Sequence, residues 1–478
     1  MNATLAVARD EWRYWRRSRL VLSVAVLFIT ILAIVSVTTA IRIHEDTHER
    51  TSHQADSEQT FLSQPDRHPH RMVHYGHYLF RAPVPLAVFD PGMDTVVGQA
   101  MFLEGHRQNS ATFSESGDSA DLGGLSWLTP AVVYQMFAPL LIIVVAHGAI
   151  VREREAGTLA PLLAQGIGGG TLIAGKALSL FSLTLLMLLP LLVSVLVSLG
   201  DGASPIAAAS IVGVYLVYLS IWIALSLLVS AALRARSSIV ASLAASWLVA
   251  TLVLPAAAVN LTSWMLPLAG KIETELTMLT EVRDLSDGHD VDDSVYDHLQ
   301  ERLLEEYGVE RVEDLSINIR GILAQMAEQE LTDTLNIYAE RRMAAEMRQT
   351  KLLEKFGWFT PALSVAVVSR TLAGTDLDHY HRFLRQAENV RINFVQGLNT
   401  AHAEELSYID DINRNRDEAS WQRARIDASN WDVLEAFNYE PADASVRLSN
   451  ASTPIIVLFV WLIALVGLLS RAAARLTP

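Results

Sequence analysis

The residues His44, Glu45 and His48 fit the H-E-x-x-H pattern that zinc proteases use. Two histidines four residues apart on a helix lie on one face and can bind one Zn²⁺, while the glutamate acts as the base. The residues that follow are polar, whereas a zinc-protease helix is normally packed in a core. Glu58 is the one conceivable third ligand. A membrane-anchored zinc peptidase therefore stands as an alternative function.

A second group of histidines follows at His68, His70, His74 and His77. Neutral imidazoles at these spacings could bind Cu²⁺ or Zn²⁺. The alternative is a structural role, because short histidine-rich tracts are only compositional hints. Eight of the 14 histidines lie within residues 44–106, which also raises the chance of a fortuitous motif.

The segment from Gly170 to Lys176 matches the phosphate-binding pattern G-x-x-x-x-G-K, but Ala177 follows. A nucleotide-binding loop needs a Ser or Thr hydroxyl at that position for Mg²⁺, and a strand before it. We therefore predict that this chain binds no cofactor, has no catalytic residues and is not an enzyme. The absence of cysteine excludes thiolate chemistry, and the net charge of −15 argues against nucleic acid as a partner.

Long runs without Asp, Glu, Lys or Arg indicate a membrane protein, because a bilayer core needs about 20 apolar residues as a helix. We predict six membrane-spanning helices, at residues 20–41, 130–150, 177–199, 207–233, 239–264 and 451–470. Pro255 could divide the fifth of them and leave a shallow re-entrant extension to residue 270. Residues 156–175 are uncharged too, but Pro161 and six glycines make them a bent surface element.

The charges between these spans predict the topology. Residues 42–129 carry a net charge of −6 and residues 267–450 carry −16, whereas the rest of the chain carries +7. Since positive charge marks the cytoplasmic side, both termini are expected in the cytoplasm, including the tail 471–478. The two acidic segments are then extracytoplasmic.

Helical patterns predict the remaining elements. Residues 1–19 form an amphipathic helix at the cytoplasmic interface, with tryptophans at headgroup depth and arginines toward lipid. Residues 267–450 are mainly helical, and Phe359–Leu372 is a core helix or a piece resting on the membrane, since it is too short to span. Two apolar stripes support this prediction: Ile319, Ile322, Met326, Leu331, Leu335 and Tyr338, then Phe383, Ala387, Val390, Phe394, Leu398 and Ala401.

The segment after the second span, 151–176, has the features of a docking surface. It reads Arg152-Glu153-Arg154-Glu155-Ala156-Gly157-Thr158-Leu159, then Leu162-Leu163, and it closes on Gly175-Lys176. This is a charged turn, a short apolar-faced helix, a glycine-rich bend and a lysine that opens the next span. The alternative interpretation is a polar turn followed by a lysine that snorkels at a helix end.

These residues resemble the coupling-helix signature of ABC-2-type permeases, the membrane subunits of ATP-binding-cassette transporters. The resemblance implies an all-α polytopic membrane protein with six transmembrane helices in the type V exporter-like arrangement. It also implies a second permease, identical or a sister, and separate ATPase subunits that carry the ATP and Mg²⁺. The ATPase contact would then involve Arg152, Glu153, Arg154, Glu155, Gly157, Thr158, Leu159, Gly175 and Lys176.

Further stretches resemble a bacterial subfamily with large external insertions after the first and fifth spans, known only as a domain of unknown function. They are residues 74–83, 90–92, 103–109 and 372–377, with Phe383 and Arg391. The resemblance implies an exporter in the bacterial inner membrane, in contact with lipid and with a possible periplasmic partner. A complex that transmits force to that partner, or that serves copper-enzyme maturation, is the other alternative.

Overall fold

The computed structural model describes residues 3–113, 127–283, 285 and 297–476. Small parts of the predicted segments 1–19, 42–129, 267–450 and 471–478 therefore lie outside the described residues. Six described helices are long and apolar enough to cross a membrane, so the chain is a multi-pass membrane protein. They comprise Val21–Leu62, Pro130–Glu155, Gly169–Gly200, Pro205–Ala232, Arg236–Met265 and Ser452–Ala474.

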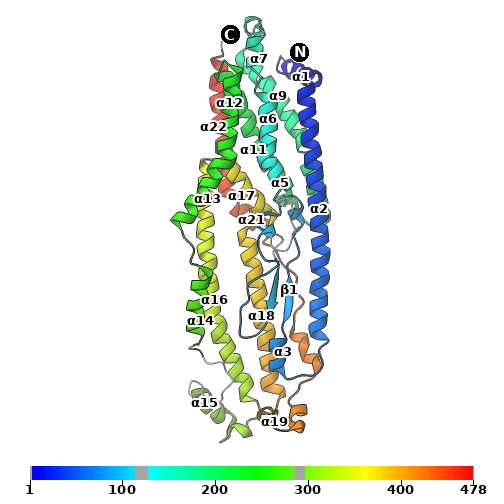
Figure 1. The fold of residues 1–478 in the computed structure, drawn as a ribbon, viewed down its shortest axis with the longest axis vertical. Helices are drawn as coiled ribbons and strands as arrows, with labels where there is room; N and C mark the ends of the chain where they lie inside the picture. Colours follow the sequence, from blue (N-terminus) through cyan, green and yellow to red (C-terminus); the bar gives the residue numbers. More distant parts are fainter. Residues whose placement is uncertain (1–2, 114–126, 284, 286–296, 477–478) are drawn as a thin grey trace.

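The first of these helices, α2 (Arg19–Leu62), is one continuous helix of 44 residues. It contains neither Gly nor Pro, the residues that most often break a helix. Only its first half is apolar, and the second half, which carries His44, Glu45 and His48, continues the same axis. Figure 1 shows α2 in blue running along most of the molecule.

Prolines in two spans are accommodated without a break. A π-helical turn at Val133–Phe137 precedes Pro139, and another at Val249–Val253 precedes Pro255. A π turn shifts the hydrogen-bond register, which relieves the clash of a proline ring with the preceding turn. The helix of the fifth span therefore passes Pro255 without a break and ends at Met265, and residues 266–270 are not helical.

The other helices of the membrane part fall in the same order as the apolar runs. They are α1 (Ala3–Arg17), α5 (Pro130–Val132), α6 (Ala138–Ala146), α7 (Val151–Glu155), α8 (Leu159–Ala164), α9 (Gly169–Met187), α10 (Leu189–Gly200), α11 (Pro205–Ala232), α12 (Arg236–Leu248), α13 (Leu254–Met265) and α22 (Ser452–Ala474). The third span begins at Gly169, so two of the three consecutive glycines lie inside a helix. Both termini, α1 and α7 lie at one end of the molecule (Figure 1).

The two long segments between spans build the opposite end and part of the middle of the molecule (Figure 1). The first contributes α3 (Pro69–Tyr75), β1 (His77–Phe80) and β2 (Ala100–Leu103), and the two strands pair antiparallel. The second contributes α14 (Lys271–Arg283), α15 (Asp297–Tyr307), α16 (Ile319–Lys355), α17 (Pro361–Ala373), α18 (Leu377–Glu405), α19 (Tyr408–Asn413), α20 (Glu418–Arg423) and α21 (Ala444–Asn450). The small two-stranded sheet is an addition to an otherwise helical fold.

These two segments are not separate domains, because they share one hydrophobic core. Phe61, Met72 and Leu79 from the first segment pack with Phe394 and Trp431 from the second. The stripe of α18 faces this core as predicted. On α16, however, Met326 is exposed, and Leu323 and Ala327 are buried instead.

Helix α17 corresponds to the short apolar stretch Phe359–Leu372. It is a core helix: Val365, Val368 and Leu372 are fully buried among the membrane helices, chiefly α11 and α22. Of the two alternatives that the sequence leaves open, the buried one is therefore correct.

Candidate functional site

A cluster of buried charges lies at the end of the molecule that holds both termini. Lys176 of α9 is 3% exposed, and its Nζ lies 2.5 Å from Oε2 of Glu11 and 2.9 Å from Oε1 of Glu153. Arg152 Nη2 lies 2.7 Å from the same Glu11 oxygen. Two cations thus neutralise two carboxylates, which is the condition under which charges are tolerated in a protein interior. We call Glu11, Arg152, Glu153 and Lys176 the Lys176 cluster.

The cluster ties three elements together, because Glu11 comes from α1, Arg152 and Glu153 from α7, and Lys176 from α9. Gly175 makes the approach possible: a Cβ atom there would lie 2.5 Å from the Val7 side chain of α1. The face of α1 that carries Trp15 therefore packs on protein, and Trp15 is only 4% exposed. The arginines opposite, such as Arg13, are exposed, but Trp15 lies in the protein core and not at headgroup depth as predicted.

The other predicted coupling residues surround this cluster. Thr158 donates a hydrogen bond of 2.6 Å to Glu153, and Leu159 is buried in the core. Arg154 donates to the carbonyl oxygens of Ala231 and Leu233, which end α11.

Around Gly157 the chain turns outward. Gly157 adopts a φ of +67°, where L side chains are strained, and its surroundings are open. Glu155 pairs with Arg236 at 2.7 Å, with both side chains about half exposed. Residues 155–170, which we call the tip, are mostly exposed.

Sequence reasoning missed Glu11, although a signal was present. Glu11 is three residues after Ala8 and four before Trp15, so it lies on the apolar side of α1 rather than with the arginines. A carboxylate on the buried side of an amphipathic helix predicts a buried cation as its partner, and that cation is Lys176.

The four histidines predicted as metal ligands do not converge on one site. His70 and His74 lie one helical turn apart on α3 and face His106, which the prediction did not include. His68 instead groups with His402 and Asp411, and His77 is buried elsewhere. The reason is the shortness of α3: His68 is its N-cap residue, and His77 follows the turn at Gly76.

The His68 group is a buried junction of hydrogen bonds. Asp411 accepts hydrogen bonds from His402 at 2.8 Å and Asn318 at 3.1 Å, lies 3.0 Å from His68, and pairs with Arg414. Burial opposes ionisation of Asp411, but the hydrogen bonds from His402 and His68 outweigh it and hold its pKa well below the usual range. Because Arg414 already supplies a positive charge, this group joins residue 68 to α18 and α19 rather than offering a metal site.

His44, Glu45 and His48 are exposed on the outer half of α2. Among the described residues, the groups of side chains that could share a metal ion do not include them. The zinc-peptidase pattern is therefore present as a helical spacing, without a third ligand from the described part of the chain.

His77 is buried in an apolar environment. It is 4% exposed, its ring centroid lies 5.5 Å from that of Phe61 and 5.4 Å from that of Phe394, and neither ring nitrogen has a hydrogen-bond partner among the described residues. Burial lowers its pKa from 6.5 to about 4. The folded protein therefore holds His77 neutral.

Replacing His77 by leucine should make folding less sensitive to acid. Between pH 6.5 and 4 the unfolded chain binds a proton that the folded chain does not, so the free energy of unfolding falls as pH is lowered. This position accounts for about 2 kcal/mol of the fall between pH 7 and pH 4.5, and His77→Leu should remove it. The measurement is denaturant unfolding in detergent at pH 7 and pH 4.5. The exposed control His44→Leu should retain the full acid sensitivity, and an equal response of both variants would contradict the assignment.

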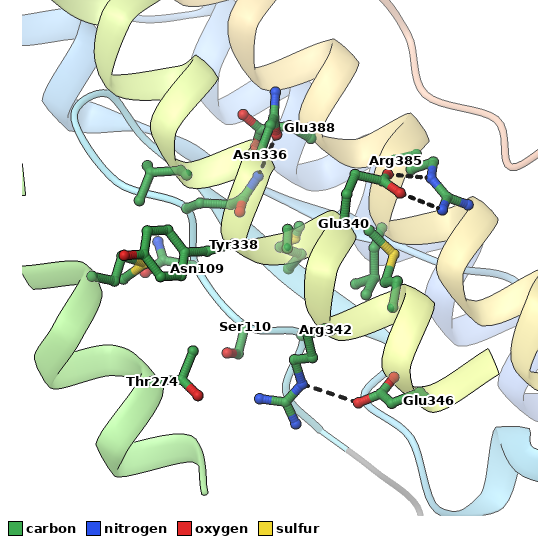
Figure 2. Close-up of a pocket in the computed structure, with 18 of the residues that line it drawn as sticks. Asn109, Ser110, Thr274, Asn336, Tyr338, Glu340, Arg342, Glu346, Arg385 and Glu388 are labelled. Atoms are coloured by element: carbon green, nitrogen blue, oxygen red, sulfur yellow. Dashed lines mark hydrogen bonds and ion pairs between the residues drawn. The ribbon is translucent and has the colours of Figure 1, made fainter. Parts of the chain in front are cut away.

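A cavity of about 470 Å³ opens between α14, α16, α18 and the loop after β2. Figure 2 shows its ion pairs: Arg385 with Glu340 at 2.6 Å, and Arg342 with Glu346 at 3.0 Å. The rest of the lining is mixed: Asn109, Ser110, Thr274 and Asn336 are polar, and Met101, Met278, Met343, Leu335 and Leu384 are apolar. The volume of this cavity lies within the range of small-molecule sites, but its lining is more polar than is typical of them.

Most of the wall of this cavity lies in the part of the chain that is similar to a known family. Residues 273–440 match a domain of unknown function, DUF3526. No curated protein matches the chain. The DUF3526 segment includes α16, α18 and α19, and hence Arg391 and Asp411, whereas the Lys176 cluster and His70, His74 and His106 lie outside it.

Proposed function

We propose that this chain is the membrane permease subunit of an ATP-binding-cassette transporter, an exporter driven by separate ATPase subunits that dock on residues 152–176. The observation that carries the proposal is the Lys176 cluster beneath the exposed tip. A docking surface that transmits motion needs two properties: an exposed contact and a rigid attachment to the helices that move.

The tip has both properties. Residues 155–170 are mostly exposed, and the buried charges of the Lys176 cluster fix their base to α1, α7 and α9. Arg154 adds a connection to the end of α11 through two backbone carbonyls. A displacement of the tip would therefore be passed to several membrane helices together, because a neutralised buried charge cluster resists separation of its members.

Topology and charge support the same assignment. The termini and the tip lie at one end of the molecule (Figure 1), which fits an even number of crossings. The acidic segments 42–129 and 267–450 follow the first and fifth spans, and the rest of the chain, which includes that end, carries a net charge of +7. By the positive-inside rule the tip then faces the cytoplasm, where ATP is available.

A second permease, identical or a sister chain, completes the proposed assembly. Val240, Val253 and Leu261 of the fifth span and Ile456 and Ile463 of the sixth are exposed. Such faces require lipid or another membrane helix as their neighbour.

Site-specific crosslinking tests the docking assignment. A photoreactive phenylalanine analogue at Ala160, exposed on α8, should crosslink in host cells to a polypeptide that carries a complete G-x-x-x-x-G-K-[ST] motif. The adduct is identified by mass spectrometry. The matched control is Ala419, an exposed alanine on α20 near the opposite end, which should give no such adduct.

Two results would refute the proposal. One is the same ATPase adduct from both positions, and the other is its absence at Ala160 while the protein is folded and inserted. An unchanged amount of co-purified ATPase after Ala160→Trp would argue in the same direction, since a bulky side chain in the contact should lower the affinity about tenfold, or 1.4 kcal/mol.

A further inference from the structure

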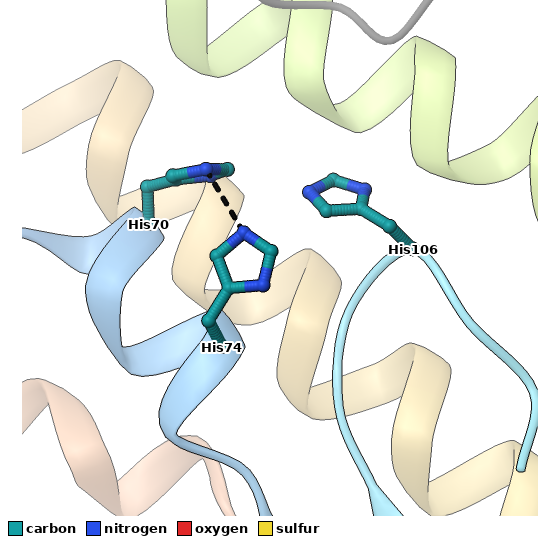
Figure 3. A group of neighbouring side chains, drawn as sticks. All are labelled: His70, His74 and His106. Carbon is teal, nitrogen blue, oxygen red and sulfur yellow. Dashed lines mark hydrogen bonds between the residues drawn. The ribbon is translucent and has the colours of Figure 1, made fainter.

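Three histidines from distant parts of the first long segment converge on one point. His70 and His74 project from one face of α3, and His106 approaches them from the turn after β2 (Figure 3). One ligand nitrogen from each lies within 4.8 Å of the others. The Nε2 atoms of His70 and His74 are 3.2 Å apart.

The 3.2 Å separation matches the geometry of two ligands on one metal ion. Two nitrogens that each lie 2.0–2.1 Å from a tetrahedral ion are about 3.3 Å apart. His106 would need to move by about 1.5 Å at most to reach the same spacing.

The turn that carries His106 is built to hold it there. Gly105 docks against α3: its N–H donates to the Val73 carbonyl at 3.0 Å, and a Cβ atom would lie 2.0 Å from the Val73 side chain. His106 itself adopts a φ of +60°, an uncommon conformation for a residue with a side chain. Such strain persists only where neighbouring contacts impose it.

The contact that fixes the conformation of His106 is made by a buried carboxylate on α16. Glu328 Oε2 accepts the backbone N–H of His106 at 3.0 Å and lies 3.0 Å from its Nδ1. Glu328 is fully buried, and its other oxygen pairs with Arg391 at 2.5 Å. With Nδ1 engaged by a carboxylate, Nε2 is the nitrogen that His106 offers to an ion, which is the arrangement common around metal-binding histidines.

We propose that His70, His74 and His106 bind a divalent transition-metal ion, Zn²⁺ or Cu²⁺, with Glu328 as the residue that positions His106. Three neutral imidazoles select such ions over Mg²⁺ and Ca²⁺, which take oxygen ligands. His74 is exposed, so water can complete a fourth position. The site joins α3 of the first long segment to α16 of the second, and bound metal stabilises that junction.

The test uses the full chain in detergent after EDTA treatment, titrated with ZnCl₂ in a calorimeter and with CuSO₄ by electron paramagnetic resonance. We expect about one ion per chain and a Cu²⁺ signal split by imidazole nitrogens. His70→Ala/His74→Ala should abolish both, and His106→Ala should weaken binding and remove one nitrogen from the signal. Glu328→Gln should lower the affinity about 10–100-fold.

The matched control is His44→Ala/His48→Ala, two exposed histidines at the same spacing on α2. It should bind like the parent chain. Thermal melting of every variant without metal separates loss of binding from loss of folding, and Zn²⁺ should raise the melting temperature only of the chains that bind it. Binding that survives His70→Ala/His74→Ala, or that disappears with His44→Ala/His48→Ala, would overturn the proposal, as would a parent chain that takes up no ion.

Discussion

Replacing Lys176 by methionine is expected to destabilise the folded chain by about 3–5 kcal/mol. The substitution retains most of the side-chain volume but removes the cation that lies between Glu11 and Glu153. Glu11 is 2% exposed, so water cannot take the place of the ammonium group. Arg152 remains, but one guanidinium then faces the buried Glu11 and the partly buried Glu153. The measurement is the free energy of unfolding in detergent.

Two further variants separate the effect of charge from the effect of packing: one at an exposed ion pair and one within the Lys176 cluster. Arg236→Met breaks the ion pair with Glu155, in which both side chains are about half exposed, and should cost at most about 1 kcal/mol. The double variant Glu11→Leu/Lys176→Met removes one charge of each sign and should recover most of the lost stability, because a buried pair can often be replaced by apolar groups. If the double variant is as unstable as Lys176→Met, packing rather than charge holds the cluster together.

The second large effect is expected at Arg391, which is 1% exposed on α18. It lies 2.5 Å from Glu328 and 2.7 Å from Glu388, and it donates to Thr332 at 2.7 Å. Arg391→Met leaves both carboxylates buried without their cation and should cost about 3–5 kcal/mol at pH 7. The matched control on the same helix is Arg385→Met, whose partner Glu340 is 53% exposed. It should cost less than about 1 kcal/mol.

The loss at Arg391 should also depend on pH. Burial raises the pKa of Glu328, but the hydrogen bond from His106 and the charge of Arg391 outweigh it, so the pKa lies below its ordinary value of 4.5. This depressed pKa stabilises the parent chain above pH 4.5 and that stabilisation is lost as pH falls. In Arg391→Met burial dominates, and protonation of Glu328 relieves the variant. The difference between variant and parent should therefore shrink from pH 7 to pH 4.5, and a constant difference would argue against the charge mechanism.

The membrane helices could be predicted from the sequence because one local property, a long run without charge, decides them. The first and last residues of these helices are harder to predict from the sequence. The predicted third span begins at residue 177, whereas the helix begins at Gly169, since glycines inside a helix are tolerated where packing stabilises it. Pro255 likewise suggested a break that a π turn absorbs.

The candidate sites were predictable only where their residues are close in sequence. His70 and His74 are four residues apart on a helix, so spacing alone indicated them. Their partner His106 and its carboxylate Glu328 come from other elements, and only the packing of α3 against α18 and of the His106 turn against α16 joins them. Glu11 and Lys176 are separated by 165 residues in the same way.

The unbroken course of α2 has a mechanical consequence. At 1.5 Å per residue its 44 residues extend about 66 Å, roughly twice the thickness of a bilayer core. With no Gly or Pro to act as a hinge, the apolar half and the polar half form one stiff rod. When the apolar half tilts among the membrane helices, the polar half tilts by the same angle. The displacement is largest near the far end of the helix, where Phe61 packs in the shared core.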